Sequence, residues 1–430
     1  MLQLDTIRRE RLSACVKGIP DFLDNVVLQD VAALRLNIFA DRFPTPLATV
    51  RRSALDANIQ LMMRFVRSVG VELAPHGKTT LCPQIFQLQL EAGAWGITCA
   101  SAAHLRTYLR HGVQRVIMAN QLIDAAATKL VAEQLRTCPE FEFYGLVDSI
   151  EGVRIYQTAM AAAPTVRKLN LLVEVGIVDG RTGVRTPDDA MAVAREIAMY
   201  PTTLVFAGLA AFEGVFRGTP QENEPKVGEL IANVETIAAR CESLGLIDAD
   251  EFVLSAGGSG YFDIVAESLA SVKLSRPTRV ILRSGCYVTH DHGFYAAAIA
   301  RLCARSVAPM FTRQAFEPAL EIWATVQSLP EPGLALITLG KRDVSHDLGL
   351  PVPLRLLRRQ GAQMTDISKQ ATLVGLNDHH GYLQCPGLRL GVGDLVSVGI
   401  SHPCTTFDRW RYLYAVDDAF NVIDVLRTFF

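Results

Sequence analysis

The chain has 430 residues, of which 50% are apolar and 20% charged, and its formal net charge is −2. This length and apolar content allow a large core or two domains. Because binding to nucleic acid needs clustered lysine and arginine, and no long basic run occurs, nucleic acid is not an expected partner.

The N-terminus and the cysteines indicate a cytoplasmic protein. The first residues lack the apolar stretch of a secretory signal, and no run of about 18 uncharged apolar residues would cross a membrane. The nine cysteines are odd in number and mostly lie within apolar runs. Such cysteines are typical of small buried side chains in a reducing compartment, so we expect no disulfide framework.

Short apolar runs alternate with helical patterns over the middle of the chain. One helical pattern, for example, begins at a capping Ser101 and ends at Gly112. The apolar runs cover residues 70–75, 94–101, 115–120, 143–149, 170–176, 204–212, 252–258 and 279–288. Eight nearly continuous apolar strands favour a (β/α)8 TIM barrel, with an open doubly wound parallel sheet as the alternative.

The pattern changes after about residue 300, where prolines, turn residues and short alternating runs indicate an antiparallel β domain. We therefore expect a helical N-terminal extension over residues 1–44, packed partly on the β domain. We expect the barrel over residues 45–300 and a C-terminal β domain with a metal site over residues 301–430.

Three motifs lie where strands of the predicted barrel end. Lys78 follows the first strand in "PHGKT", "SAGGSG" (255–260) follows the seventh, and "RSGCY" (283–287) follows the eighth. Barrel enzymes carry their chemistry at this end and often bind phosphate after strands seven and eight. Each motif alone is compatible with a surface lysine or a tight turn. Together they predict pyridoxal 5'-phosphate, whose aldehyde reacts with a lysine amine.

The motifs taken together resemble the D-serine dehydratase and D-threonine aldolase family of alanine-racemase-like pyridoxal enzymes. The resemblance extends from "TPLATVRRSALDANI" (45–59) to "SHPCTT" (401–406) and includes "LLVEVGIVDGRTGV", "VLSAGGSG" and "ILRSGCYV". The chain looks closest to bacterial members described as amino acid deaminases or D-serine deaminase-like proteins.

The resemblance implies a role for each motif residue. Lys78 matches the lysine that binds the cofactor covalently and takes the Cα proton of a D-amino acid. His76 would tune this lysine, or only stack beside it, and Arg181 would face the pyridine ring or its phenolic oxygen, or form a loop salt bridge. The catalytic candidates are Lys78, His76 and Arg181, and the cofactor-binding candidates are Lys78, Arg181, Gly257, Gly258, Ser259, Gly260, Ser284, Gly285 and Tyr287.

A metal site is expected at His402 and Cys404. On an extended strand, residues two apart point to the same face, and imidazole and thiolate both bind zinc. The pair alone is compatible with packing, but the resemblance implies a divalent metal, zinc, held by a His-x-Cys pair in dehydratases. The aldolase branch has aspartate in the second position, so Cys404 favours dehydration. His380 would act as a supporting group, and residues 290–292 are expected to form a solvated loop.

One segment departs from the family pattern. Many relatives have tyrosine and histidine after the sixth strand, where this chain has Phe212 and Glu213. The substrate side-chain preference is therefore open, because Glu213 would either disfavour acidic substrates or pair with a basic group.

The resulting hypothesis is a metal-assisted dehydratase that converts D-serine or a D-threonine-like substrate to a 2-oxo acid and ammonia, and the resemblance also implies a homodimer. The alternatives are a D-threonine-type aldolase, a non-catalytic pyridoxal-binding protein, and a barrel lysine that reacts directly with a sugar phosphate. A racemase is disfavoured because no second base is evident.

Overall fold

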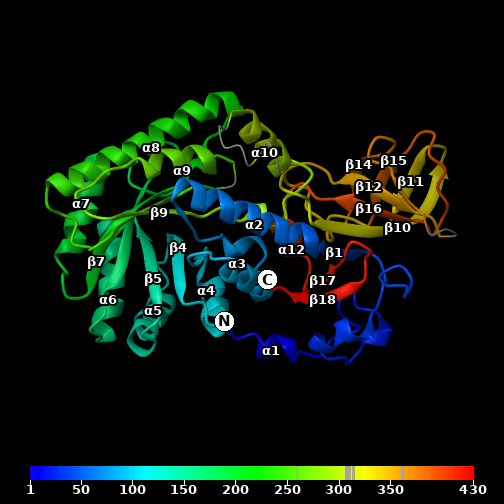
Figure 1. The fold of residues 1–430 in the computed structure, drawn as a ribbon, viewed down its shortest axis with the longest axis horizontal. Helices are drawn as coiled ribbons and strands as arrows, with labels where there is room; N and C mark the ends of the chain where they lie inside the picture. The colour runs from blue at the N-terminus through cyan, green and yellow to red at the C-terminus, as the bar shows by residue number, and fades with distance from the viewer. Residues whose placement is uncertain (259, 306–310, 312–314, 360–362) are drawn as a thin grey trace. The chain divides into compact units, whose positions relative to one another are not determined.

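The computed structural model describes the chain except for residues 259, 306–310, 312–314 and 360–362 (Figure 1). Contacts between Cα atoms divide the chain into two compact units. The first, here called the barrel unit, contains residues 1–2, 62–78 and 89–285. The second, here called the sheet unit, contains residues 3–61, 79–88 and 286–430. The domain boundaries expected at residues 44 and 300 stay a prediction.

The barrel unit contains a parallel sheet of eight strands, one in each of the eight predicted runs. Their order in the sheet is β2-β9-β8-β7-β6-β5-β4-β3. The backbone N–H groups of Trp95 and Thr98 donate to the carbonyls of Leu73 (2.8 Å) and Pro75 (2.9 Å), which joins the two ends of this order. The strands are β2 (Glu72–Leu73), β3 (Ile97–Cys99), β4 (Arg115–Gln121), β5 (Glu142–Val147), β6 (Leu169–Val175), β7 (Leu204–Ala211), β8 (Phe252–Ala256) and β9 (Thr278–Leu282). The predicted barrel is confirmed.

The interior of this barrel is filled by buried apolar side chains from around the whole ring. Such a packed interior is the normal state of an eight-stranded barrel, which leaves its chemistry to the strand ends. The cluster consists of Ala74, Trp95, Ile117, Leu146, Leu172, Ala207, Ala210, Val253 and Ile281.

Helices cover the outside of the strands, as α5 to α8 show in Figure 1. Ser101 caps α4 as predicted, since its side chain accepts a hydrogen bond from the His104 N–H. The helices are α2 (Arg52–Val69), α3 (Pro83–Glu91), α4 (Ala102–Arg110), α5 (Ala125–Thr137), α6 (Ile150–Ala162), α7 (Pro187–Ala198), α8 (Pro220–Ser243), α9 (Phe262–Ala270) and α10 (Phe294–Arg305). The first parts of α2 and α3, and all of α10, belong to the sheet unit and are not part of the barrel.

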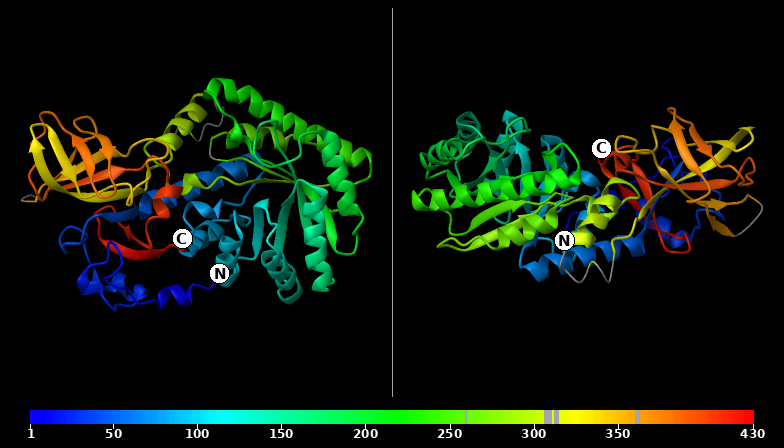
Figure 2. Two further views of the ribbon diagram at one scale, coloured as in Figure 1. Left: turned by 180° about the vertical axis from the view of Figure 1, so that it is seen from behind. Right: turned by 90° about the horizontal axis from the view of Figure 1, so that it is seen from above.

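The sheet unit is built on one ten-stranded sheet with the main order β13-β12-β16-β10-β1-β17-β18, and β11, β15 and β14 extend from β10. Figure 2 shows the ribbon in two further views, with most strands of this sheet coloured yellow to red. All its pairs are antiparallel except β1 with β17. The antiparallel sheet expected after about residue 300 is confirmed, and it also contains β1 from earlier in the chain. The strands are β1 (Leu47–Arg51), β10 (Leu320–Glu331), β11 (Leu334–Ile337), β12 (Val352–Leu357), β13 (Met364–Asp366), β14 (Thr372–Leu376), β15 (Gly381–Gln384), β16 (Leu395–Gly399), β17 (Tyr412–Val416) and β18 (Val422–Arg427).

The N-terminal segment has little regular structure: a short helix α1 (Asp5–Arg8) and two 3₁₀ turns, Asp21–Leu23 and Leu28–Leu34. Ion pairs of Lys17 and Glu10 attach it to the rest of the sheet unit. Lys17 Nζ lies 2.9 Å from Asp343 Oδ1, and Glu10 Oε2 lies 3.0 Å from Arg427 Nε.

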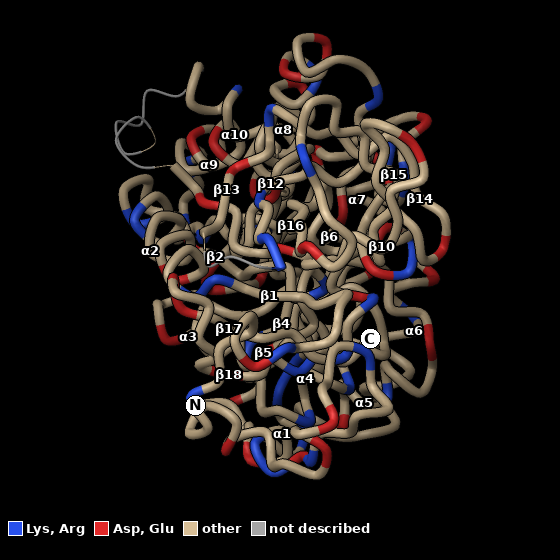
Figure 3. Tube along the Cα trace, turned by 90° about the vertical axis from the view of Figure 1, so that its right-hand side faces the viewer, with Lys and Arg blue, Asp and Glu red and all other residues tan. Residues whose placement is uncertain are grey.

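Basic and acidic residues are interspersed along the trace in Figure 3, as the net charge of −2 leads one to expect. Among the described helices, none is long and apolar enough to cross a bilayer.

Candidate active site

Lys78 lies in a 3₁₀ turn, Gly77–Thr79, shortly after β2, at the C-terminal end of the barrel strands. The chain turns here as soon as His76 has paired with Thr98 of β3. Gly77 permits this turn: a Cβ atom there would lie 2.1 Å from the hydroxyl of the buried Tyr108. The Lys78 side chain is exposed.

Positive charges surround His76. Burial lowers the pKa of this imidazole well below its ordinary value, and the nearby charges of Lys78, Arg283, His104 and Arg181 lower it further. His76 is therefore neutral at pH 7. Its buried Nδ1 has no hydrogen-bond partner among the described residues. The structure thus brings the three predicted catalytic residues, Lys78, His76 and Arg181, into one electrostatic environment, and it adds Arg283.

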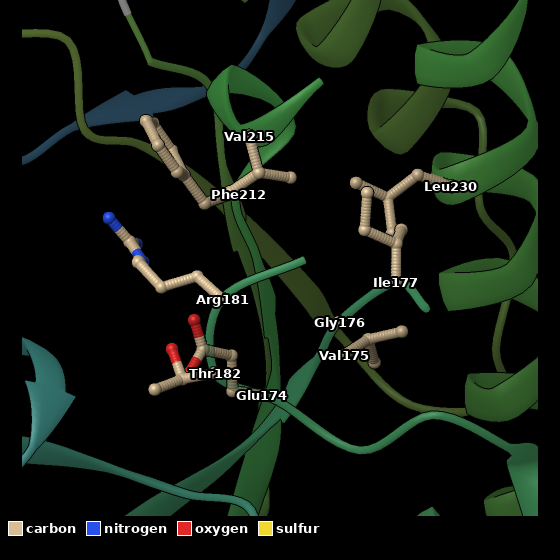
Figure 4. A pocket seen from close by; sticks show the side chains of 9 residues that line it. All are labelled: Glu174, Val175, Gly176, Ile177, Arg181, Thr182, Phe212, Val215 and Leu230. Atoms are coloured by element: carbon tan, nitrogen blue, oxygen red, sulfur yellow. The ribbon is translucent and has the colours of Figure 1, made fainter. Parts of the chain in front are cut away.

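Arg181 lines a small pocket together with Glu174 and Phe212 (Figure 4). Its guanidinium carbon lies 4.8 Å from the centre of the Phe212 ring, a cation–π contact. In Figure 4 the guanidinium lies between this ring and the Glu174 carboxylate. The loop salt bridge weighed as the alternative is not seen among the described residues. Arg181 instead presents an exposed cation to the pocket.

Arg283, which sequence reasoning missed, is buried at the end of β9. Its Nη2 donates to the Ala211 carbonyl (2.5 Å), and its Nη1 has no hydrogen-bond partner among the described residues. Burial lowers the pKa of this guanidinium, whereas the carboxylates of Glu174 and Glu213 raise it. Gln121 in turn donates to Glu174 Oε2 at 2.5 Å. Both charges could have been noticed in the sequence. Glu174 lies next to the end of one apolar run, "VEV", and Arg283 ends another, "ILR".

The Glu213 carboxylate is hydrogen-bonded to the backbone N–H groups of the glycine-rich turn. It is buried in the 3₁₀ turn Glu213–Val215 after β7, and it accepts hydrogen bonds from the N–H groups of Gly257 (Oε2, 3.2 Å) and Gly258 (Oε1, 2.5 Å). These are the amides that the sequence predicted for a cofactor phosphate. Glu213 therefore pairs with two backbone amides, and the substrate side-chain preference stays open.

The remaining predicted cofactor residues have different surroundings. Ser259 lies outside the described residues, and its neighbour Gly260 is partly exposed. Ser284 is buried and its hydroxyl donates to the carbonyls of Gly258 (2.7 Å) and Gly257 (3.1 Å), so it fixes the turn. Gly285 is also buried. In the sheet unit, the buried Tyr287 packs edge-on against Phe316. Cofactor contacts of these residues stay predictions.

In the sheet unit, a carboxylate supports the ring of His402. Its Nδ1 lies 2.7 Å from Asp347 Oδ2, and Thr405 donates to the other oxygen of the same carboxylate. Burial alone would raise the pKa of Asp347, but the hydrogen bonds from Thr405 and His402 lower it below its ordinary value. A carboxylate on one ring nitrogen is the usual support for a histidine that binds a metal through the other nitrogen.

Cys404 does not continue an extended strand from His402. Pro403 has helical dihedral angles (φ −62°, ψ −45°) and Cys404 begins the short helix α12 (Cys404–Phe407), so the predicted strand geometry is wrong. The Cys404 sulfur lies 3.7 Å from that of Cys286 and 3.5 Å from Thr79 Oγ1. Among the described residues, no group of three or more histidine, cysteine, aspartate or glutamate side chains is arranged to hold a metal. A two-ligand site remains compatible with these contacts.

Residues 290–292 are not a solvated loop, and this expectation is wrong. Asp291 is buried, and its carboxylate accepts hydrogen bonds from the N–H groups of Gly293, Tyr295 and Ala296 at the start of α10. His290 is buried as well.

His380, proposed as a supporting group, is half-buried in the turn between β14 and β15. Its backbone carbonyl accepts a hydrogen bond from the Asn377 N–H. A supporting role for the His380 side chain stays a prediction.

Comparison with known proteins places this geometry in context. Residues 319–416 match the model of a family described as a putative serine dehydratase domain. The chain is 26% identical over 380 residues to a D-threonine aldolase from an Arthrobacter species, covering 88% of this chain and 90% of the relative. The crystal structure of D-threonine aldolase from Filomicrobium marinum superposes with a TM-score of 0.72 at 24% identity, covering 90% of this chain and 95% of that one.

A D-threo-3-hydroxyaspartate dehydratase from Delftia sp. HT23 has the same fold, with a TM-score of 0.69 at 20% identity over 90% of this chain and 98% of that one. The resemblance to the D-serine dehydratase and D-threonine aldolase family, predicted from the motifs, is confirmed.

Proposed function

We propose that this protein is a pyridoxal-phosphate-dependent lyase that acts on small D-3-hydroxy amino acids. The observation that carries the proposal is the position of Lys78, just past β2, where its charge and those of Arg181 and Arg283 act together on His76. The names of the relatives, a D-threonine aldolase and a D-threo-3-hydroxyaspartate dehydratase, support this substrate class.

The residues of the barrel unit fit an anionic aromatic cofactor. The buried Nη1 of Arg283 and Nδ1 of His76 lack partners among the described residues, and such atoms are stabilised when a ligand pairs with them. Arg181 and Lys78 add exposed cations. Lys78 would hold the cofactor, and Arg181 and Arg283 would balance its negative charge.

The bound cofactor would supply an electron sink for the pair of electrons released at the substrate Cα. The chain must then move protons. The Lys78 amine would take the Cα proton, which leaves with the β-hydroxyl as water. His76 stays neutral, so it adds no further positive charge beside that amine.

Dehydration is the reaction we propose, because Cys404 stands where the resemblance places a metal ligand of the dehydratases. Loss of the Cα proton and of the β-hydroxyl releases water, and hydrolysis of the remaining enamine gives a 2-oxo acid and ammonia. We propose that His402 and Cys404 hold a divalent metal on which this step depends, because hydroxide leaves poorly without a Lewis acid.

Retro-aldol cleavage is the second candidate, and the 26% identity to D-threonine aldolase over most of the chain favours it. In this reaction the hydroxyl loses its proton, the Cα–Cβ bond breaks, and glycine and an aldehyde are formed. Both reactions begin at the same amino acid, so the products distinguish them.

The test is a product assay on purified protein with D-serine, D-threonine and D-3-hydroxyaspartate, each beside its L-isomer. Oxo acid and ammonia support dehydration, whereas glycine and aldehyde support the aldolase. Borohydride reduction followed by peptide mass analysis should place the cofactor on Lys78, and a label elsewhere would contradict the proposal. Gel filtration tests the homodimer that the resemblance implies.

A further inference from the structure

Two cysteine sulfurs of the sheet unit lie in contact, and one of them belongs to a candidate metal ligand. Cys286 Sγ lies 3.7 Å from Cys404 Sγ, although the two residues are 118 positions apart in the sequence. Cys286 begins the 3₁₀ turn Cys286–Val288, and Cys404 begins α12. The function proposed above gives no role to Cys286, so its contact with Cys404 is a separate feature of this chain.

Backbone hydrogen bonds hold together the two segments that carry these cysteines. The His292 N–H donates to the Ile400 carbonyl (2.8 Å). The Phe294 N–H donates to the Ser401 carbonyl (3.4 Å). Between these bonds, a Cβ atom on Gly293 would lie 2.9 Å from Ser401 Cα, so the two backbones pass as closely as a glycine allows. The contact between the sulfurs therefore lies beside a close and hydrogen-bonded approach of two backbones.

Each cysteine is also fixed by a turn of its own. The Cys286 carbonyl accepts a hydrogen bond from the His290 N–H (2.9 Å), and the Cys404 carbonyl accepts one from the Asp408 N–H (3.4 Å). A disulfide bond is about 2.05 Å long, so the sulfurs must approach each other by about 1.7 Å. Rotation of the two side chains about their Cα–Cβ bonds covers this distance while the turns stay in place.

The two contacting thiols differ from the buried thiols of this chain. Cys286 and Cys404 are half-buried, so a small oxidant can reach them. Burial raises the pKa of Cys82, Cys99 and Cys241 to about 12. Because the thiolate is the reactive form of cysteine, these three buried thiols are inert at neutral pH.

We propose that Cys286 and Cys404 form a reversible disulfide, so that Cys404 is either a metal ligand or a disulfide partner. The oxidant is a low-molecular-weight disulfide, represented by oxidised glutathione. One cysteine sulfur attacks this disulfide and releases one glutathione thiolate, and the other cysteine sulfur then attacks the mixed disulfide and releases the second. The two cysteines give up two protons and two electrons, and the oxidant becomes two thiols. Disulfides of this kind in a reducing compartment are typically transient and sense the redox state.

Oxidation removes one of the two candidate metal ligands and leaves the other. A metal binds the deprotonated thiolate of a cysteine, and a disulfide sulfur has no such charge. His402 and its supporting Asp347 are unchanged by the reaction. A Cys404 thiolate that binds a metal is in turn unable to attack the oxidant. This coupling to the metal rests on the proposed function, whereas the disulfide itself does not.

The test is incubation of the full chain with oxidised glutathione, followed by digestion without reductant and peptide mass analysis. We expect a cross-linked pair of peptides that contain Cys286 and Cys404, and dithiothreitol should separate them. Cys286→Ser should instead keep one glutathione on Cys404, because no second sulfur displaces it. Cys15→Ser is the matched control: it removes an exposed thiol of the N-terminal segment and should give the same cross-link as wild type.

Zinc binding, measured by competition with a chelator, tests the coupling. The oxidised wild type should bind zinc more weakly than the reduced protein by more than about 10–100-fold, which is the cost of losing only a supporting group. Reduced Cys286→Ser should bind zinc as tightly as the reduced wild type, and zinc added first should slow the cross-link. Equal zinc affinities of the oxidised and reduced wild type would overturn the exclusive role of Cys404.

The disulfide and the metal site fail in different ways. Wild-type cysteines that stay reduced, or that each carry a glutathione without a cross-link, would overturn the disulfide. A cross-link from Cys404 to any other cysteine would overturn it as well. Reduced wild-type protein that binds no zinc would refute the metal assignment of the proposed function, and the peptide masses would still decide whether the disulfide forms.

Discussion

Replacing Gly257 by alanine should destabilise the barrel unit for two reasons: a strained backbone and a steric clash. The residue has φ +85°, and left-handed backbone costs roughly 1–2 kcal/mol for a residue with a Cβ. The new Cβ would also lie 2.6 Å from Cδ2 of the fully buried Leu282, and such overpacking costs about 1–3 kcal/mol. The sum is about 2–5 kcal/mol of unfolding free energy.

Two other glycines of the barrel unit separate these parts. Gly245 has φ +65° with open space around it, so Gly245→Ala should lose only the backbone part, about 1–2 kcal/mol. Gly228 lies exposed within α8, with open space around it and an ordinary φ. Gly228→Ala should therefore raise the free energy of unfolding by up to about 1 kcal/mol.

The assay is urea unfolding of the three variants and the wild type, followed by far-UV circular dichroism. The expected order of stability is Gly228→Ala, wild type, Gly245→Ala and Gly257→Ala. Equal losses for Gly257→Ala and Gly245→Ala would refute the steric reasoning, because they would show that Leu282 yields without cost. In that case the tight approach of the turn to β9 would not hold the Gly257 amide in place.

Three further predictions concern the site and the buried histidines. Lys78→Arg keeps the charge but should lower turnover by about 10²–10⁴-fold or more, and wild-type turnover in this variant would refute the role of the amine. Asp347→Asn should weaken zinc binding by about 10–100-fold, measured by competition with a chelator, because His402 loses its supporting carboxylate; unchanged affinity would argue against a metal on His402. Burial lowers the pKa of His292 to about 4, so its contribution to stability is present above about pH 6.5 and is lost as the pH falls towards 4. His292→Gln should therefore reduce the loss of unfolding free energy between pH 7 and pH 5 by about 2 kcal/mol relative to wild type, and an unchanged loss in this variant would contradict the reasoning.

The sequence by itself determined the barrel. Each strand is a buried apolar run, and burial on both faces of a parallel sheet requires such runs, so eight of them could be counted directly. Lys78, Arg181 and the glycine turns were also found from the sequence, because each follows a predicted strand and strand ends meet on one face of a barrel. The positions of these residues along the chain therefore contained most of the information about where the site lies.

Only the tertiary structure decided which groups pair at that face. Glu213 follows β7 and the glycines follow β8, so their hydrogen bonds exist only once neighbouring strands are in register. The partners of Arg283 likewise come from other strands, and no local pattern encodes them. At Cys404 a helical Pro403 overrode the expected strand. Local patterns fix which segments are buried, but the partner of a buried charge depends on contacts between segments far apart in the chain.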